Sequence, residues 1–235
     1  MKIVRDRIAR STQEEKKELC EALGLNNIQK IKNNEEIVKE YASAGGHSVM
    51  NVIRFFTNNE IPYKQILIDI ADKLYPSFGW TSYSVNDKHT EIEIENEIEK
   101  FLLERMEEKW ESLSEEEKFK LTKKIEKEMK KKGMKQSTID SIIKGIAGGG
   151  LAYMTATPLA MTIFYSSIFS SIWATIFGVS TFALATSVLL ITGPLAVLIV
   201  GTPAYKKTIP ATITLIRIRK RIEAEEALKK ELKGL

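Results

Sequence analysis

Apolar residues recur every three or four positions through residues 1–144, and no stretch shows the alternation expected of a half-buried strand. Capping residues precede several of these segments, for example Ser11 with Glu14 or Thr12 with Glu15, and Ser114 with Glu117. A pair of glycines, Gly45 and Gly46, indicates a turn, and Gly133 indicates a helix end. The pattern predicts an all-α fold with amphipathic helices at about 12–23, 34–42, 48–58, 63–74, 90–111, 115–132 and 137–146.

Charge disappears after this region. Gly145 to Tyr205 contains no Asp, Glu, Lys, Arg or His in 61 consecutive residues, although 28% of the whole chain is charged. A bilayer core needs about 20 apolar residues per helical span. The run is therefore long enough for a helical hairpin with two spans, at about 159–177 and 181–200, joined by a turn at Gly178.

The two expected spans differ in how readily they would insert. The second has eleven Leu, Ile, Phe or Val residues, and the first has eight together with four serines and two threonines. We expect the second span to insert unaided and the first to need its partner. The residues expected in the bilayer are Leu159, Ile163, Phe164, Ile168, Phe169, Ile172, Trp173, Ile176, Phe177, Phe182, Leu184, Leu189, Leu190, Leu195 and Leu198.

Small residues recur every four positions in the first span. Thr162, Ser166, Ser170, Ala174 and Gly178 would form one ribbon on the helix and let a neighbouring backbone approach closely. This small-residue ribbon is the expected helix-packing surface, and it would serve a homo-oligomer. Two alternatives to a membrane hairpin stay open: a soluble form that can enter membranes, as in colicin-type toxins, and a permanently buried core hairpin.

Basic residues flank the run on both sides. Lys127 to Lys144 includes six lysines and two acidic residues, and Lys206 to Arg221 includes six basic residues and no acidic one. Because cytoplasmic flanks of membrane spans are rich in Lys and Arg, we expect both termini in the bacterial cytoplasm, with a cytoplasmic protein as the alternative. Nucleic acid is not the expected partner. The residues expected at anionic lipid headgroups are Lys130, Lys131, Lys132, Lys206, Lys207, Arg217, Arg219, Lys220 and Arg221.

The flanks complete a three-part division of the chain. We expect an amphipathic helical domain at 1–144, the uncharged hairpin at 145–205 and a basic amphipathic helix at 206–235. Pro203 and Pro210 would bracket a linker before a final helix at 211–232.

Motifs of catalysis and of cofactor or metal binding are not found in the sequence. There is no Gly-x-Ser-x-Gly, no phosphate-binding loop, no dinucleotide fingerprint and no Cys/His metal spacing. Glu91, Glu95 and Glu99 follow one another at four-residue steps, and we expect them to form a solvated acidic face. Cys20 is the only cysteine, which fits a reducing compartment and a structural position on a helix. The expected protein is not an enzyme and has no cofactor.

Four segments resemble the bacterial YaaW family. They are the Gly45-Gly-His-Ser-Val-Met-Asn51 stretch, the Tyr63-to-Leu74 helix, the Glu-rich block from Ile92 to Glu117 with Trp110, and Ala204 to Ala211. The family has no established activity, and the resemblance implies only a distant similarity to chaperones that assemble the ubiquinol-cytochrome c reductase. Family members keep scattered charges where this chain has none, so the membrane hypothesis belongs to this sequence alone.

Two hypotheses for function follow. In the first, the hairpin self-associates, inserts into the bilayer and perturbs or perforates it. In the second, the hairpin is a passive anchor or a buried core, and the helical domain binds a protein partner as an adaptor or assembly chaperone.

Overall fold

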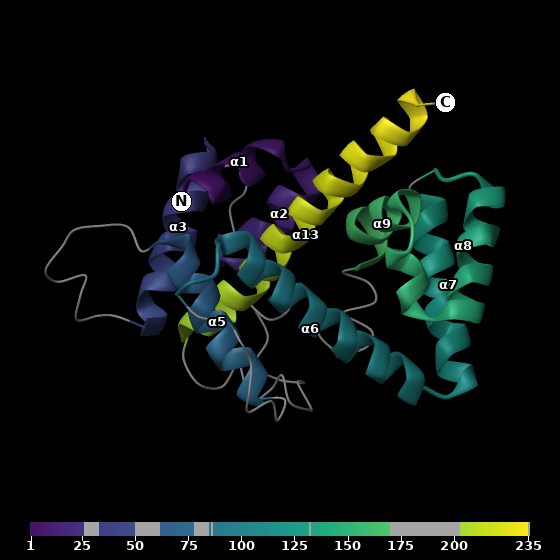
Figure 1. The fold of residues 1–235 in the computed structure, drawn as a ribbon, viewed down its shortest axis with the longest axis horizontal. Helices are drawn as coiled ribbons and strands as arrows, with labels where there is room; N and C mark the ends of the chain where they lie inside the picture. The colour runs from purple at the N-terminus through teal and green to yellow at the C-terminus, as the bar shows by residue number, and fades with distance from the viewer. Residues whose placement is uncertain are drawn as a thin grey trace, which may run out of the picture. The chain divides into compact units, whose positions relative to one another are not determined.

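Helices form all the regular secondary structure that the structure describes. The computed structural model describes residues 1–25, 33–49, 62–77, 85, 87–131, 133–169 and 203–234. No strand occurs among these residues, and the predicted all-α fold is confirmed (Figure 1).

The chain divides into two compact units. Unit 1 consists of Met1–Lys100 and Thr181–Ile216, and unit 2 consists of Phe101–Ser180 and Arg217–Leu235. Two long helices, α6 (Glu91–Ser112) and α13 (Pro203–Lys233), have residues in both units. The three-part division of the chain, which was drawn from charge alone, stays a prediction.

Unit 1 is built from α1 (Lys2–Arg10), α2 (Gln13–Ala22), α3 (Asn34–Val49), α5 (Tyr63–Ser77) and the first parts of α6 and α13. Helix α3 packs against both α1 and α5. The core takes apolar side chains from every one of these helices, including Ile8, Leu19, Val38, Ile66, Leu67, Ile94, Ile98 and Ile213, each at most 2% exposed. Their periodic spacing in the sequence explains why these segments fold as amphipathic helices.

The helix starts follow the capping signals in the sequence. Thr12 accepts a hydrogen bond from the Glu15 backbone at 3.2 Å while the Glu15 carboxylate accepts one from the Thr12 backbone at 2.8 Å. Thr90 with Glu93 and Ser114 with Glu117 make the same reciprocal pair of bonds. Of the two alternatives for the first helix, the structure shows Thr12 with Glu15, and it confirms the box at Ser114 and Glu117. Each box satisfies amide donors that the first helical turn leaves unpaired.

The predicted turn at Gly45 and Gly46 is wrong, because α3 runs through both residues to Val49. Packing explains the glycine at position 45. A Cβ atom there would lie 2.4 Å from Cδ1 of Ile66 on α5. Gly45 thus allows α3 and α5 to approach closely.

Unit 2 contains the second part of α6, α7 (Glu115–Lys131), α8 (Gln136–Gly149), η2 (Leu151–Thr155), α9 (Pro158–Ile163), the π-helical turn η3 (Phe164–Ile168) and the end of α13. Helix α7 packs against α8 and η3. Gly133 has a φ of 73° and follows α7, as predicted. Helix α8 begins one residue before the predicted cap Ser137 and continues to Gly149, and Gly150 ends it with a φ of 61°.

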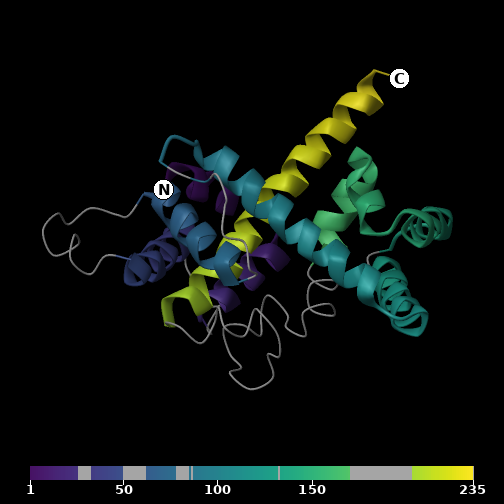
Figure 2. The same ribbon diagram turned by 60° about the horizontal axis from the view of Figure 1, so that its bottom comes forward.

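The predicted linker between Pro203 and Pro210 is also wrong. Helix α13 begins at Pro203 and includes Pro210, and it is one continuous ribbon in both views (Figure 2). Proline within a helix costs about 3 kcal/mol because it removes a backbone hydrogen bond. Every residue from Thr208 to Ile216 is buried. Packing of this buried segment offsets the proline, which is why local sequence signals misplaced the start of the helix.

Candidate functional site

Most of the described part of the uncharged run lies in unit 2, from Gly145 in α8 to Phe169. The last residues of the run, Pro203 to Tyr205, begin α13 in unit 1. Thr157 caps α9 by accepting a hydrogen bond from the Ala160 backbone at 3.2 Å, with Pro158 in the first turn. The π-helical turn η3 follows directly and packs against α7. A π-turn inserts an extra residue into the helix and rotates the side chains that follow it.

Four aromatic or aliphatic residues at this start of the first expected span are buried. Ile163, Phe164, Tyr165 and Phe169 are 5%, 0%, 1% and 4% exposed, and the rings of Phe164 and Phe169 meet edge to face at 5.5 Å. Leu159 is 47% exposed. The first expected span therefore begins with one exposed residue and a compact aromatic cluster.

The remaining residues expected in the bilayer lie outside the described residues, apart from the backbone of Ile168. They are Ile172, Trp173, Ile176, Phe177 and the whole second expected span. Over the ranges that are described, no helix is both long enough and apolar enough to cross a membrane. The hairpin stays a prediction.

The small-residue ribbon is described at its first two positions. The Thr162 hydroxyl donates to the Pro158 carbonyl at 2.8 Å, and the Ser166 hydroxyl donates to the Ile163 carbonyl at 3.4 Å. Both hydroxyls are thus satisfied within their own helix, which is how Ser and Thr are accommodated in apolar surroundings. Ser170, Ala174 and Gly178 lie outside the described residues.

Three of the expected headgroup residues precede the uncharged run, at the end of α7 and directly after that helix. Lys130 is exposed and forms an ion pair with Glu126 at 2.7 Å. Lys131 is exposed at the end of the helix. Lys132 lies outside the described part of the chain.

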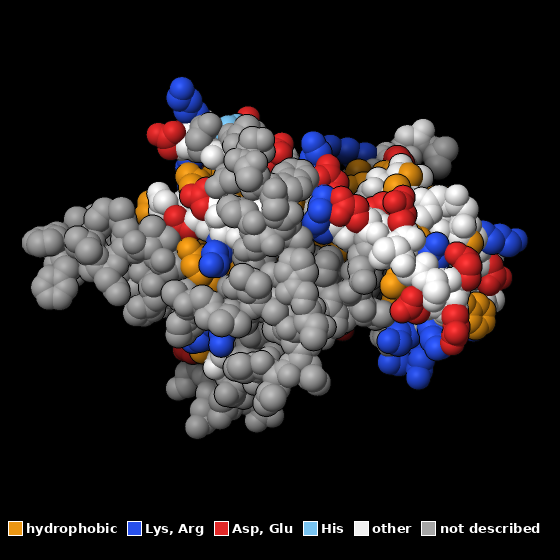
Figure 3. Space-filling model, turned by 90° about the horizontal axis from the view of Figure 1, so that it is seen from below, with side chains coloured by type: hydrophobic (Ala, Val, Ile, Leu, Met, Phe, Trp, Pro, Cys, Tyr) orange, Lys and Arg blue, Asp and Glu red, His pale blue; other side chains and the backbone are white. Residues whose placement is uncertain are grey.

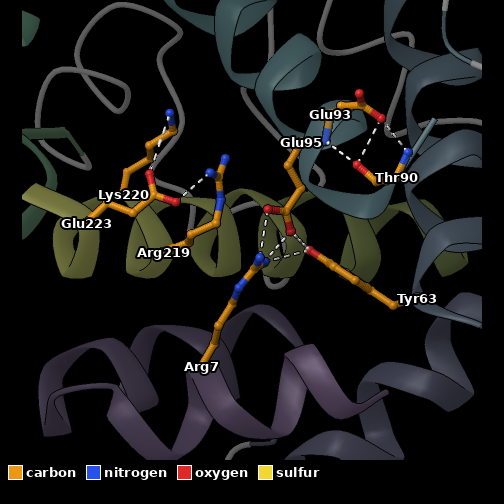
Figure 4. Close-up of polar contacts among 8 residues, drawn as sticks. All are labelled: Arg7, Tyr63, Thr90, Glu93, Glu95, Arg219, Lys220 and Glu223. Atoms are coloured by element: carbon orange, nitrogen blue, oxygen red, sulfur yellow. Dashed lines mark hydrogen bonds and ion pairs between the residues drawn. The ribbon is translucent and has the colours of Figure 1, made fainter.

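The expected headgroup residues after the run are less exposed. Lys207 is half-buried and forms an ion pair with Glu40 of α3 at 2.8 Å, and Lys206 is also half-buried. Arg217, Arg219 and Arg221 are buried, at 4%, 7% and 5% exposed. In Figure 4, Arg219 and Lys220 both point to the carboxylate of Glu223, at 2.8 Å and 3.8 Å. Arg221 pairs in the same way with Glu225 at 2.8 Å.

A buried polar cluster in unit 1 was not predicted. Arg7 of α1 donates to Oε2 of Glu95 at 2.8 Å and also bonds Oε1, and the Tyr63 hydroxyl bonds the same Oε1 (Figure 4). Arg7 further donates to the Tyr63 hydroxyl at 3.1 Å. Arg7 is 4% exposed and Glu95 is 0% exposed. The expectation of a solvated acidic face is therefore wrong at Glu95, and also at Glu99, which is 7% exposed.

The cluster joins elements that are far apart in the sequence. It connects α1, α5 and α6, and Tyr41 of α3 bonds Thr212 of α13 at 2.6 Å beside it, with its ring 6.1 Å from that of Tyr63. Burial and the negative charge of Glu95 raise the pKa of Tyr63 well above its ordinary value. Burial alone would lower the pKa of Arg7, but Tyr63 and Glu95 outweigh it and the pKa is raised. The cluster therefore holds a fixed ion pair with a neutral phenol.

Asp69 of α5 is a second buried polar group in unit 1. It is 7% exposed, its Oδ1 accepts a hydrogen bond from Gln65 at 2.9 Å, and its Oδ2 has no hydrogen-bond partner. Burial raises the pKa of Asp69 to about 6. Asp69 and Asp72 in turn contribute to a raised pKa of Tyr205, whose principal cause is burial. Tyr205 in the first turn of α13 is thus within electrostatic reach of a buried carboxyl whose pKa is raised to about 6.

Neither buried group forms a recognisable catalytic arrangement. Among the described residues, no three His, Cys, Asp or Glu side chains are placed to hold a metal ion. Cys20 is 1% exposed, and burial raises the pKa of its thiol to about 11, so the reactive thiolate does not form near neutral pH. Cys20 occupies a structural position on α2, as expected.

Comparison of the chain with protein-family models, with curated proteins and with solved structures found no match. The resemblance to the YaaW family therefore stays a prediction that rests on the quoted residues.

Proposed function

We propose that this chain is a membrane-associated helical protein of the bacterial cytoplasmic membrane, whose uncharged run inserts into the bilayer as a hairpin and self-associates there. The observation that carries the proposal is the absence of charge over the 61 residues from Gly145 to Tyr205. Two spans of about 20 apolar residues fit within this length.

Both ends of the uncharged run are held by contacts within the helical units. On one side, η3 packs against α7 of unit 2, and on the other, Lys207 pairs with Glu40 and Thr212 bonds Tyr41 within unit 1. Both termini of the chain then belong on the cytoplasmic side, with the turn at Gly178 on the other side. Self-association along the small-residue ribbon is the step by which the hairpin would perturb or perforate the bilayer.

Burial at the start of the first span favours a second function. Phe164 and Tyr165 are at most 1% exposed, so this part of the run already has apolar cover. In the alternative, the hairpin is a passive anchor or a buried core, and the helical units act as an adaptor or assembly chaperone for a protein partner. Release of a dye trapped in vesicles separates the two, because only the perforating form releases it.

Membrane fractionation and cysteine labelling test the proposal together. The protein should remain in the membrane pellet through high salt and alkaline carbonate and leave only with detergent, because two inserted spans hold it by apolar contact. In a Cys20→Ser background, Ser180→Cys should react in intact cells with an impermeant thiol reagent. Ser137→Cys and Lys229→Cys, at two exposed positions, should react only after the cells are permeabilised.

Each outcome has a definite meaning. Recovery of the protein in the soluble fraction would contradict the membrane assignment. Equal labelling at all three positions in intact cells would contradict the hairpin topology.

A further inference from the structure

Helix α7 of unit 2 has one apolar side and one strongly basic side. Leu121, Ile125 and Met129 are at most 1% exposed and form the buried side. With 100° of rotation per residue, the opposite side is centred near positions 116, 123 and 127. The lysines on this outer side are Lys120, Lys123, Lys124, Lys127, Lys130 and Lys131, all of them exposed. We call this surface the α7 basic face.

The α7 basic face has a net positive charge even after its ion pairs are counted. Glu116 pairs with Lys120 at 2.5 Å, and Glu126 pairs with Lys123 at 2.9 Å and with Lys130 at 2.7 Å. The six lysines and these two glutamates give a net charge of +4. The view from below shows basic side chains beside acidic and hydrophobic ones at the right of the molecule, the side on which Figure 1 labels α7 and α8 (Figure 3).

An aromatic side chain lies within the α7 basic face. Phe119 is 63% exposed, and the Lys123 ammonium lies 5.7 Å from the centre of its ring. Phe119 is one of only four large apolar side chains that are exposed among the described residues. Helices that lie on a membrane surface combine a cluster of lysines with an aromatic residue that enters the boundary between headgroups and acyl chains.

We propose that the α7 basic face docks on the headgroups of an anionic phospholipid bilayer, with Phe119 entering the interface. The inference rests on the proposed function for the presence of a bilayer, and it assigns the first contact to a surface outside the uncharged run. A bilayer fits better than nucleic acid for two reasons. The face contains lysines and no arginine, whereas arginine is the residue that forms bidentate contacts with bases and phosphates. It also exposes a phenylalanine, which has no polar handle for a groove.

The electrostatic part of this docking has a predictable size. A basic residue near an anionic leaflet contributes about 1 kcal/mol, which corresponds to about fivefold in partition. The triple variant Lys124→Gln/Lys127→Gln/Lys131→Gln should therefore weaken binding of the full chain to phosphatidylglycerol-containing vesicles by roughly 100-fold at low salt. Glutamine has nearly the same helix propensity as lysine, so α7 should keep its fold.

The matched control removes the same charge elsewhere. Lys229, Lys230 and Lys233 are exposed near the end of α13. The variant Lys229→Gln/Lys230→Gln/Lys233→Gln should bind the same vesicles within about threefold of the unmodified chain. Equal loss of vesicle binding in the two triple variants would overturn the proposal. It would show that binding depends on the net charge of the chain and not on the α7 basic face.

A fluorescent probe separates this inference from hairpin insertion. In a Cys20→Ser background, an environment-sensitive dye on Phe119→Cys should shift to shorter wavelength with anionic vesicles and not with phosphatidylcholine vesicles. A dye on Ser180→Cys reports insertion of the run. A shift at 180 without one at 119 overturns docking through α7 and leaves the proposed function intact, whereas no shift at 180 contradicts the insertion itself. Binding of the α7 face to homopolymeric RNA, with no preference for anionic vesicles, would overturn the lipid assignment.

Discussion

Glu95 in unit 1 and Glu126 on α7 have similar partners in opposite environments. Each carboxylate bonds two side-chain donors, Arg7 and Tyr63 for Glu95, and Lys123 and Lys130 for Glu126. Glu95 is 0% exposed, whereas Glu126 is 19% exposed and its two lysines are 59% and 51% exposed. A fully buried carboxylate that loses its partner keeps the full desolvation penalty, but a partly exposed one can be solvated by water. The buried ion pair of Glu95 therefore stabilises the fold of unit 1, whereas the lysines that pair with Glu126 on α7 remain accessible to a binding partner.

The largest effect should come from breaking the buried pair. Arg7→Ala leaves the Glu95 carboxylate without its guanidinium in a site that excludes water, and we expect a loss of about 3–5 kcal/mol in the free energy of unfolding. Arg5→Ala on the same helix is the matched control, because the pair of Arg5 with Glu35 is 41% and 50% exposed. That control should lose less than about 1 kcal/mol. Urea unfolding followed by circular dichroism measures both.

Removing both partners sharpens the same test. The double variant Arg7→Met/Glu95→Met replaces a buried ion pair with apolar side chains, and such replacements are often neutral or stabilising. We therefore expect it to recover most of the stability lost in Arg7→Ala. A double variant as unstable as Arg7→Ala would show that the unpaired charge is not the main cause, and that packing around Arg7 or the Tyr63 hydroxyl left without its two partners causes the loss.

Substitution of Asp69 should raise the free energy of unfolding, in contrast to Arg7→Ala, and the change should be smaller than that of Arg7→Ala. Its folded pKa of about 6 lies above the ordinary value of 3.8, so the folded state prefers the protonated form. The stability gained from this preference is complete below about pH 4 and is lost as the pH rises through 6. Asp69→Asn should remove this pH dependence and raise the free energy of unfolding at pH 7 by about 1–3 kcal/mol.

A nearby aspartate provides the control for this measurement. Asp72 lies on the same helix but is exposed. Asp72→Asn should leave the decline in stability between pH 4 and pH 7 in place. If Asp69→Asn keeps that decline, the buried carboxylate is not its cause.

The sequence predicted helices better than it predicted which polar residues are buried. Capping boxes at Thr12 and Ser114 involve residues three apart, so they can be recognised locally, and both are confirmed. The bond between Arg7 and Glu95 joins residues 88 apart, so no local sequence signal identifies the two residues as partners. Pro210 gave a wrong prediction of a linker, because burial of α13 outweighs the local helix-breaking tendency of proline. The only sequence signal that could have singled out Glu95 was its place in the apolar spacing of α6, next to Ile94 and Ile98.

Of the substitutions considered, Glu126→Gln should have the smallest effect on the free energy of unfolding. It should nevertheless change the binding to anionic vesicles. Hydrogen bonds from Lys130 and Lys123 lower the pKa of Glu126 to about 2, but water competes for all three groups. Glu126→Gln should leave the unfolding curve unchanged. It also removes the carboxylate that two lysines of the α7 basic face share, so binding to anionic vesicles should rise by about fivefold. A loss of stability as large as that of Arg7→Ala would mean that Glu126 is held as Glu95 is, and an unchanged affinity would mean that Lys123 and Lys130 do not face the bilayer.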